Sequence, residues 1–420
     1  MRGRTNASNG GIFLNATTDD FEVATGNSIV AGDFVEYHYD TAEKTISGSS
    51  FSEECFLVDA TAKLYITRLS GYATLITYDN GTITIEDSYT TAQSTELVKY
   101  NDTTYLSTSG DVFTVDVANK TLTLSSNINK TFQHKVGNYL VSVERSGSST
   151  VTYTVKTFSC ADLSNITLVD TKSVTDQSGS RLVIGKSFGN GICFGVYLVS
   201  NTSSQHMAYG KLKFAYIDLT NGSITSIENL LVFDTSASSS ISASMTFVGN
   251  AIGERYILTH FHYGYSGHYT YEDRIYDTTS RDLKNNLSTA DNYIPVRSDY
   301  TDKNGYYYWL LYYATSGSTF FFDLYKTDKQ TGLSELCDTV SATYNTSPLW
   351  VFDNNDFALL RVSSPSIYYK IVKAINDQIV EGTLTDTVQE WSGGLNPLGV
   401  AKQSGNAGDT IEVYIPQVNS

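Results

Sequence analysis

Two histidines stand one residue apart in the stretch LTHFHYGYSGHY, and imidazole nitrogens are common ligands of zinc and copper. On a strand, His260 and His262 share one face because side chains alternate, and His268 follows after a glycine-containing turn. The same spacing is also typical of an ordinary strand whose rings pack against a neighbouring strand. We therefore predict no bound metal, and His260 and His262 are kept as the candidate ligands if one is present.

The densest aromatic stretch of the chain is YYYWLLYY at 306–313, and three phenylalanines follow at 320–322. Aromatic faces pack on the apolar faces of sugar rings while phenol hydroxyls bond sugar hydroxyls, so such a stretch is suited to bind a glycan. Alternation along a strand sends about half of the rings into the protein instead. The predicted ligand-binding residues are Tyr306, Tyr308, Trp309 and Tyr312.

Sequence motifs of known catalytic sites are missing: there is no G-x-S-x-G, P-loop, H-E-x-x-H or dinucleotide fingerprint. The adjacent acids Glu53-Glu54 and Glu272-Asp273 point to opposite faces of a strand, so neither pair is by itself a catalytic dyad. Two carboxylates about 5–10 Å apart, as a glycosidase needs, can still come from distant parts of the chain. We predict no catalytic residue and no cofactor, and a glycan-degrading enzyme stays open.

The charge composition and the lack of a long apolar stretch argue against two classes of partner. The chain has 44 acidic and 28 basic residues, a formal net charge of −16, and only 17% of its residues are charged. A nucleic-acid binder needs clustered Lys and Arg to displace counterions, and no such run occurs. No stretch of 18 apolar residues is present, so the sequence predicts no membrane-spanning helix. We predict neither a nucleic acid nor membrane insertion.

Hairpin signals repeat along the chain, each with an aspartate just before a polar turn. In LITYDNGTITIED, alternating residues flank Asp79-Asn80-Gly81, and Asn and Gly accept the positive φ of a tight turn. Successive aspartates of this kind are 37 to 59 residues apart, a period typical of the four-stranded blades of a β-propeller. The aspartates are Asp40, Asp79, Asp116, Asp162, Asp218, Asp277, Asp328 and Asp377.

A further apolar run precedes most of these hairpins, for example NYLVSV at 138–143 and RYILTHF at 255–261. We interpret each run, together with the hairpin after it, as one blade. Without the hairpin at Asp40, the repeated aspartates give about seven blades. Blades repeat because one sheet cannot bury both of its faces alone. We predict an all-β fold with a propeller of approximately seven blades over residues 49–391. A string of β-sandwich domains is the alternative.

The two ends of the chain share a different pattern, Ala-Gly-Asp followed by an alternating strand, at 31–33 and 407–409. Gly32 and Gly408 suit tight turns with positive φ. Two such half-patterns on either side of a repeat array predict one small β-barrel made from residues 1–48 and 392–420. The propeller is then a large insertion into this barrel, as close domain termini allow.

These terminal segments resemble a small β-barrel module of bacteriophage virion proteins, including head-decoration proteins. The family pattern A-G-D-x-V matches residues 31–35, and G-[VI]-A-x-x-x-G-x-A-G-[DE]-x-[IV]-x-V matches residues 399–413. The resemblance covers roughly 65 of the 420 residues and carries over no catalytic residue. It implies that the barrel docks onto the particle through Gly32, Asp33, Gly399, Gly408 and Asp409.

The resemblance implies a non-enzymatic bacteriophage virion surface protein, which is a head-decoration, head-fibre or tail component. Its barrel would dock on capsid or tail proteins, and its propeller would bind a host-surface protein or glycan. It would be oligomeric in the particle, assembled in the host cytoplasm and exposed outside the cell. The alternatives are a glycan-degrading enzyme, a depolymerase or glycosidase, on a propeller scaffold, and a purely structural capsid decoration protein.

Overall fold

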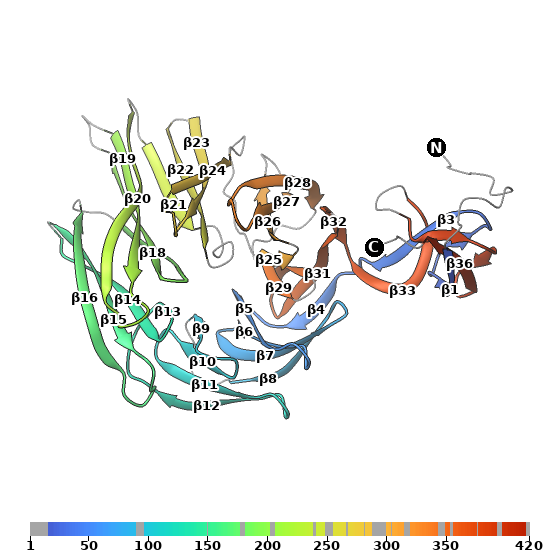
Figure 1. The fold of residues 1–420 in the computed structure, drawn as a ribbon, viewed down its shortest axis with the longest axis horizontal. Coiled ribbons are helices and arrows are strands. Elements are labelled where there is room, and N and C mark those ends of the chain that lie inside the picture. Colours follow the sequence, from blue (N-terminus) through green and yellow to red (C-terminus); the bar gives the residue numbers. More distant parts are fainter. Residues whose placement is uncertain are drawn as a thin grey trace. The chain divides into compact units, whose positions relative to one another are not determined.

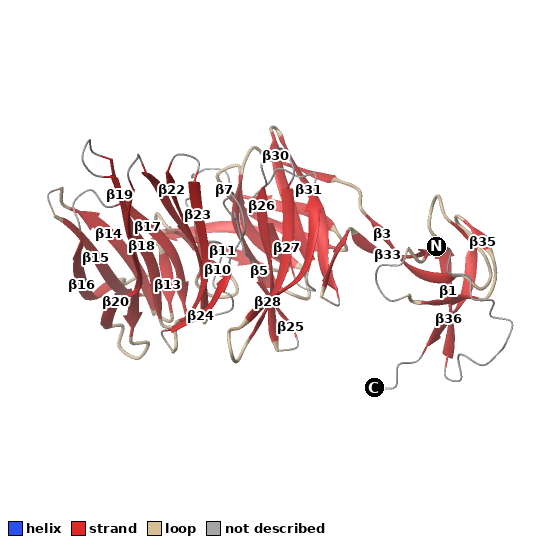
Figure 2. Cartoon of the chain, turned by 90° about the horizontal axis from the view of Figure 1, so that it is seen from above, coloured by secondary structure: helices blue, strands red, loops and turns tan. Residues whose placement is uncertain are grey.

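A computed structural model describes most of the chain, and every element in the described residues is a strand (Figure 2). The described residues are 16–89, 96–148, 150–176, 181–201, 206–237, 241–247, 255–265, 268–280, 282–287, 300–303, 305–314, 320–342, 349–352, 356–375, 377–392 and 397–416. No helix in these residues is long and apolar enough to cross a membrane.

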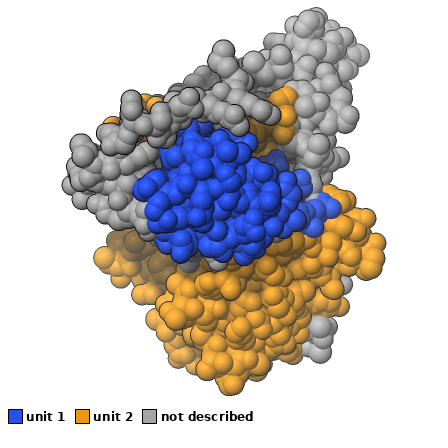
Figure 3. All heavy atoms as spheres, turned by 90° about the vertical axis from the view of Figure 1, so that its right-hand side faces the viewer, with its two compact units in different colours: residues 1–43, 370–420 blue, residues 44–369 orange. Residues whose placement is uncertain are grey.

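The chain divides into two compact units, residues 1–43 with 370–420 and residues 44–369, which Figure 3 shows in different colours. The first unit is thus discontinuous in sequence, with the second inserted into it. The sequence pattern predicted boundaries at 48 and 392, and these limits stay a prediction. One strand that the prediction assigned to the propeller, β33 (Thr383–Glu390), belongs to the closed barrel.

The first unit contains a small closed barrel of five strands in the order β1-β33-β3-β34-β36. The strand pairs β1–β36 and β3–β33 join the two ends of the chain, and a short β2–β35 pair lies beside the barrel. Val23, Val35, Val388, Ile411 and Val413 fill its core. The other bounds are β1 (Ala16–Val23), β2 (Ser28–Ile29), β3 (Phe34–Asp40), β34 (Gly399–Ala401), β35 (Gly405–Asn406) and β36 (Thr410–Pro416).

The two Ala-Gly-Asp segments form equivalent turns of this barrel. Asp33 accepts a hydrogen bond from Val30 N through its carboxylate (2.9 Å), and Asp409 accepts one from Asn406 N (2.8 Å). Gly32 and Gly408 have φ of +93° and +82°, where glycine is favoured. Their N–H groups donate to Ala401 O and Val23 O, each 2.9 Å away.

Each turn exchanges hydrogen bonds with a barrel strand, because Ala401 N of β34 donates back to Asp33 O and Val23 N of β1 donates back to Asp409 O. Gly399 is required for close packing, since a Cβ there would lie 2.1 Å from Tyr414 O. The residues predicted to dock on a particle therefore have roles within the barrel, which account for their types and spacing. No docking function is needed to explain them.

The second unit is built from antiparallel sheets, six of which have four strands (Figure 1). Their strands, sheet by sheet, are β5 (Phe51–Asp59), β6 (Leu64–Leu69), β7 (Tyr72–Asp79), β8 (Thr82–Ser88); β9 (Leu97–Lys99), β10 (Thr104–Ser107), β11 (Asp111–Asp116), β12 (Thr121–Asn127); β13 (His134–Val136), β14 (Tyr139–Ser146), β15 (Val151–Ser159), β16 (Thr167–Asp176); β17 (Arg181–Phe188), β18 (Gly191–Asn201), β19 (His206–Ile217), β20 (Ile224–Ala237); β21 (Ile241–Phe247), β22 (Tyr256–Tyr265), β23 (His268–Asp277), β24 (Asp282–Leu287); and β25 (Tyr300–Lys303), β26 (Tyr306–Ala314), β27 (Phe320–Asp328), β28 (Ser334–Ala342).

A further sheet has five strands, in the order β29-β30-β31-β32, with β4 paired to the beginning of β31. Its strands are β4 (Lys44–Ser47), β29 (Leu349–Phe352), β30 (Asp356–Ser363), β31 (Ser366–Ile375) and β32 (Gln378–Glu381). The all-β class and the propeller-like arrangement with a small barrel are thus confirmed. The four-stranded sheets give six blades, and the predicted number of about seven is not confirmed.

The repeated aspartates lie where the third strand of a sheet turns into the fourth, from Asp79 at β7–β8 to Asp328 at β27–β28. In the turns after Asp79, the carboxylate accepts backbone N–H groups two or three residues ahead, as Asp116 does from Asn119 N and Asp218 from Thr220 N. This local hydrogen bonding fixes the turn and explains why aspartate recurs. The apolar runs at 138–143 and 255–261 are largely second strands, β14 and β22.

Neighbouring sheets bury their faces against each other. One core cluster combines Val141 and Val155 of the β13–β16 sheet with Phe194 and Ala215 of the β17–β20 sheet. Another joins the β5–β8 and β9–β12 sheets, and β5 contacts β29 of the last sheet. Each sheet therefore depends on its neighbours for burial, as the repeat predicted.

The contact between the first and last sheets is aromatic. Tyr78 and Phe352 stack in parallel with ring centroids 3.9 Å apart, and the Tyr78 hydroxyl donates to the buried carboxylate of Asp356. Burial, together with the negative charge of Asp356, raises the pKa of Tyr78 far above its ordinary value, so this phenol stays protonated.

Candidate functional site

The predicted ligand-binding aromatic residues lie on β26, and those whose side chains the structure describes differ in how deeply they are buried. Trp309 is fully buried, stacks on Tyr325 with centroids 4.5 Å apart, and donates its indole N–H to Thr327 (2.9 Å). This burial does not suit the ligand-binding role predicted for Trp309. Tyr306 and Tyr308 are half-buried, so their role stays a prediction, and the side chain of Tyr312 lies outside what the structure describes.

The candidate metal ligands His260 and His262 lie on β22, but their side chains are outside the described part of the structure. In the described part, no group of three or more His, Cys, Asp or Glu side chains could hold a metal ion. The four cysteines form no disulfide, and burial raises the pKa of Cys160 to about 11. Neither feature supplies a reactive group.

A different group of titratable side chains meets on the face that β19 turns toward the β13–β16 sheet. Asp176, the last residue of β16, lies 3.2 Å from Lys211 Nζ through Oδ1 and 3.3 Å from Lys213 Nζ through Oδ2. The Tyr209 hydroxyl donates to Asp176 Oδ1 (3.0 Å), and Lys213 donates to Asn229 Oδ1 of β20 (2.8 Å). We call Tyr209, Lys211, Lys213 and Asp176 the Asp176 cluster.

The Asp176 cluster is buried, but unevenly. The side chains of Asp176 and Lys213 are 1% and 5% exposed, whereas that of Lys211 is 22% exposed. Val232 lies directly opposite Lys211 in the β19–β20 pair and is 52% exposed, and such cross-strand neighbours share a face. The Lys211 end of the cluster therefore borders open surface.

This environment shifts the pKa values of the cluster in opposite directions. Burial lowers the pKa of Lys213, even though the nearby charge of Asp176 favours its protonated form. Burial alone would also lower the pKa of Lys211, but hydrogen bonds with Tyr209 and Asp176 outweigh it and hold this pKa above its ordinary value. Burial raises the pKa of Tyr209.

The strands that carry this cluster depart from the repeat. The β19–β20 pair has register shifts at two points, at Tyr216/Ile217 near its turn and at Leu212/Lys213 beside the buried lysine. The equivalent pairs β7–β8, β11–β12, β15–β16, β23–β24 and β27–β28 show one shift each in their described residues. Bulges are over-represented beside active sites, where they redirect a side chain.

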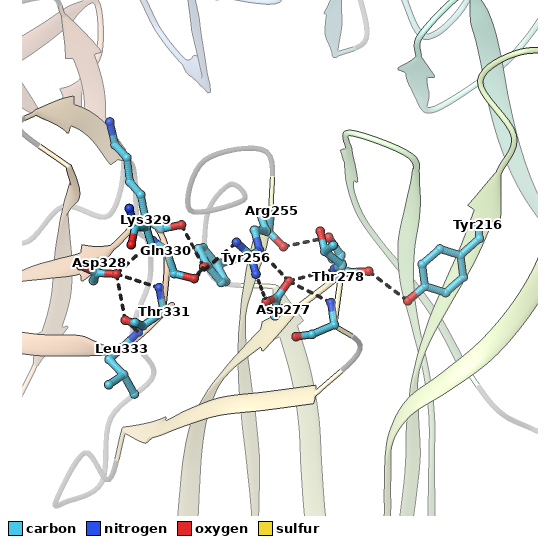
Figure 4. Close-up of polar contacts among 12 residues, drawn as sticks. Tyr216, Arg255, Tyr256, Asp277, Thr278, Asp328, Lys329, Gln330, Thr331 and Leu333 are labelled. Atoms are coloured by element: carbon cyan, nitrogen blue, oxygen red, sulfur yellow. Dashed lines mark hydrogen bonds and ion pairs between the residues drawn. The ribbon is translucent and has the colours of Figure 1, made fainter.

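A second buried aspartate, Asp277, lies at the turn end of the blades (Figure 4). Arg255 pairs with it through two bonds, from Nε to Oδ1 (2.9 Å) and from a terminal nitrogen to Oδ2 (2.6 Å). Thr279 N and Ser280 N also donate to Oδ1. Burial alone would raise the pKa of Asp277, but these bonds outweigh it and hold the pKa well below its usual range.

The surroundings of Asp277 connect three sheets, as Figure 4 shows. Tyr216 of β19 donates to Thr278 O (3.3 Å), and Tyr256 of β22 donates to Lys329 O after β27 (3.1 Å). The Arg255 guanidinium balances the charge of the Asp277 carboxylate, and backbone N–H groups add hydrogen bonds to it. This arrangement holds neighbouring blades together and leaves no titratable group poised for chemistry.

Comparisons with known proteins place the chain in no named family. No family model matches the chain, and no curated protein matches it. It is similar to a solved oligogalacturonate lyase in complex with manganese, at 10% identity over 89% of this chain and 98% of that one, with a TM-score of 0.37. It is also similar to a putative 6-phosphogluconolactonase from Bacteroides fragilis, at 10% identity over 83% of this chain and 98% of that one, with a TM-score of 0.34.

A protein from Lactobacillus plantarum is similar at 12% identity over 77% of this chain and 96% of that one, with a TM-score of 0.38. None of the three is a virion protein, and two are described as enzymes. The predictions of a bacteriophage virion protein and of a non-enzyme are corrected accordingly. At TM-scores below 0.5 the likeness supplies no argument for a reaction or a substrate, which must come from the Asp176 cluster itself.

Proposed function

We propose that this chain is a glycan-degrading enzyme on a propeller scaffold and that the Asp176 cluster supplies its acid and base. Two lysines and a tyrosine converge on one buried carboxylate beside open surface, and this observation carries the proposal. Titratable groups whose environment moves their pKa values are typical of functional sites.

Cleavage of a glycosidic link needs a base on one side and an acid that protonates the departing oxygen. The lowered pKa of Lys213 enlarges the fraction of neutral amine, which can accept a proton, and the raised pKa of Tyr209 keeps its phenol protonated, so that it can donate one. Asp176 contacts both groups, 3.0 Å from the phenol and 3.3 Å from the amine. It therefore provides a route for returning the proton after each turnover.

A carboxylate pair, which typical glycosidases use, does not describe this cluster. The only carboxylate in the Asp176 cluster is Asp176, and two lysines hold it. The proposed chemistry therefore begins with proton removal by an amine. Attack by a carboxylate or by carboxylate-activated water has no group to perform it in this cluster.

The scaffold of this proposed enzyme includes the five-stranded sheet as a seventh blade. Within residues 44–369 that sheet comprises β4, β29, β30 and the beginning of β31, which is the four-strand pattern of the other blades. In such a blade, β4 comes from the beginning of residues 44–369, and the other three strands come from the end of that range. This supports the blade number that the sequence predicted.

The proposed function is tested by incubating the full chain with neutral and acidic polysaccharides and measuring release of new chain ends. We expect release from at least one polymer and a rate about 100-fold lower for Lys213→Met, as loss of a general base typically gives. The matched control is Lys156→Met, since Lys156 pairs with Glu144 between β14 and β15, outside the cluster. No release from any polymer, or an undiminished rate for Lys213→Met, would overturn the proposal.

A further inference from the structure

The outer face of the barrel carries a row of hydrogen-bonded polar side chains. On β3 and β33, Val35 and Val388 point into the core, so Glu36 and Gln389, which pair directly, point outward. Gln389 Nε2 donates to Glu36 Oε1 (3.0 Å), and Gln389 Oε1 lies 2.7 Å from His38 Nδ1. We call Glu36, His38 and Gln389 the Gln389 row.

The chemistry of its members fixes the orientation of the Gln389 row. A carboxylate only accepts hydrogen bonds, so the amide nitrogen of Gln389 faces Glu36 and the amide oxygen faces His38. An amide oxygen also only accepts, so His38 Nδ1 carries a proton, and Nε2 is an acceptor when the ring is neutral. Among the described residues, none bonds this Nε2, the second oxygen of Glu36 or the second amide N–H of Gln389. The row therefore presents acceptors and a donor side by side.

The pairing of β3 and β33 is irregular beside His38, because the register shifts between Tyr37 and Tyr39. At this point Thr385 donates to His38 O (2.8 Å), and its hydroxyl lies 2.8 Å from that of Thr387. Bulges redirect side chains and are over-represented beside functional sites. Here the irregularity adds two hydroxyl groups next to the Gln389 row.

An aromatic pair ends the Gln389 row. Trp391 follows Gln389 by two residues and donates its backbone N–H to Phe34 O (2.9 Å), so it continues the pairing of the two strands. The rings of Trp391 and Phe34 pack edge to face with centroids 5.9 Å apart, and both are half-buried. Ring faces pack on the apolar faces of sugars, while neighbouring polar groups bond sugar hydroxyls. The face combines both kinds of group.

The charge of this face distinguishes between classes of sugar. Asp20 and Glu22 of β1 are exposed, and Glu22 pairs with Thr387 of β33, on the same outer side as Glu36. The strands β1, β3 and β33 contain no Lys or Arg. An anionic sugar would meet carboxylates here, and like charges repel. A neutral sugar is not repelled, and its hydroxyls both donate and accept, as the Gln389 row requires.

We propose that this outer face of the barrel binds neutral glycans, with Trp391 against a sugar ring and the Gln389 row bonded to its hydroxyls. The inference goes beyond the proposed function and does not rest on it, because the barrel and residues 44–369 belong to separate compact units. In a glycan-degrading enzyme, such a face holds the polymer while another part of the chain cleaves it.

The test measures retention of the full chain on beads that carry xylan, galactomannan or mixed-linkage β-glucan, beside beads that carry polygalacturonate or polylysine. We expect retention on at least one neutral polymer and none on polygalacturonate. Gln389→Leu and Trp391→Ala should each weaken the retention about 10-fold, as loss of a hydrogen bond or of a ring contact gives. The matched control is Gln403→Leu, since Gln403 follows β34 and bonds Thr410 O of β36, outside this face.

Thermal unfolding checks that each variant folds, and Gln389→Leu, which changes an outward side chain, decides if Trp391→Ala does not. Retention on polygalacturonate alone, retention that Gln389→Leu leaves unchanged, or no retention on any neutral polymer would overturn the inference. Retention that depends on Gln389 only on polylysine would assign the face to a cationic partner and would also overturn it. Retention without release of new chain ends would remove the proposed function and leave this inference standing.

Discussion

Asp277 and Asp176 are both buried aspartates of the blades, but their surroundings differ. We assign a role in stability to Asp277 and a role in chemistry to Asp176. Asp277 meets one arginine in a bidentate pair and two backbone N–H groups, so its charge is matched and its oxygens are occupied. Asp176 is instead shared by two lysines and a tyrosine, all of which can titrate. Burial alone does not distinguish the two sites; the kind and number of titratable partners around each carboxylate do.

The difference has a physical basis in local structure. Asp277 is the turn aspartate of the repeat, and the hydrogen bonds that fix its turn also hold its pKa low. Asp176 is at the far end of an outer strand, away from the Asp162 turn that begins β16. Its partners come from the next sheet, where one of the two register shifts of the β19–β20 pair lies beside Lys213.

The largest effect we expect is a difference in turnover between two tyrosine variants, one at the Asp176 cluster and one near Asp277. Tyr209→Phe should lower turnover about 100-fold or more, because the phenyl ring keeps its packing while the proton donor is lost. Tyr256→Phe removes a phenol that bonds Lys329 O at the turn end, and it should leave turnover unchanged while costing about 1 kcal/mol of stability. Initial rates and urea unfolding of both variants measure turnover and stability. An equal loss of rate in the two variants would contradict the different roles assigned to the two sites.

The next effect concerns the cation that Asp277 needs. Arg255→Met should lower the free energy of unfolding by about 2–4 kcal/mol, because it leaves a buried carboxylate without the arginine that pairs with it. The value is below that for a fully buried pair since Arg255 is partly exposed. Urea or thermal unfolding measures it. A loss under about 1 kcal/mol would show that the backbone donors alone sustain Asp277.

The pH dependence of stability should also follow Asp277. Its pKa in the folded state is lower than the unfolded value of about 3.9, so its contribution to stability is complete above that pH and is lost as the pH falls below it. Asp277→Asn should therefore cost most at neutral pH, and its difference from the wild type should shrink in acid. Unfolding free energies of both proteins across this range test the sign. A difference that grows in acid would contradict it.

The pH dependence of turnover should follow the other site. Activity needs a neutral Lys213 and a protonated Tyr209, so the rate should rise through the lowered pKa of Lys213 and fall through the raised pKa of Tyr209. Lys211 and Asp176 are the other charged groups that face Tyr209 and Lys213. A rate profile of kcat/KM measures the two limbs, and a rate that decreases steadily from acid to alkaline pH would contradict the assignment.

The smallest effect is expected at a turn aspartate whose hydrogen bonds are exposed to solvent. Asp218 makes the same kind of turn as Asp277, but its carboxylate accepts from the neutral groups of Thr220 and Asn221. Asp218→Ala should lower the melting temperature slightly and leave turnover unchanged. Thermal unfolding and initial rates measure both effects. A decrease as large as that of Arg255→Met would show that the turn, and not the buried charge pair, determines stability at this end.

The sequence predicted the repeat because the signals of a hairpin are local. The turn aspartates and the apolar second strands are each readable within about ten residues, and Gly32 and Gly408 indicate tight turns in the same way. Alternation cannot tell which face of a strand is buried, so it did not show that Trp309, predicted to bind a ligand, lies in the core. The virion resemblance rested on turn residues that the barrel itself requires.

The Asp176 cluster could not be predicted because its members meet only when two sheets stack. Asp176 and Lys211 are 35 residues apart and lie in different blades. One signal was present, since Lys211 and Lys213 alternate in the strand GKLKFAYI, whose intervening residues Leu212 and Phe214 are core residues. Two lysines on one face of such a strand need a buried partner, but the sequence does not name it.

The most direct test of the proposed chemistry is the unfolding free energy of Lys213→Met beside that of Arg255→Met, with turnover measured on the same preparations. Removing Lys213 leaves Asp176 balanced by Lys211, so we predict that Lys213→Met is at least as stable as the wild type and is nearly inactive. Arg255→Met should be destabilised yet active while folded. If Lys213→Met instead loses several kcal/mol of stability and its activity falls only with its folded fraction, the Asp176 cluster is structural and its assignment as an active site is wrong.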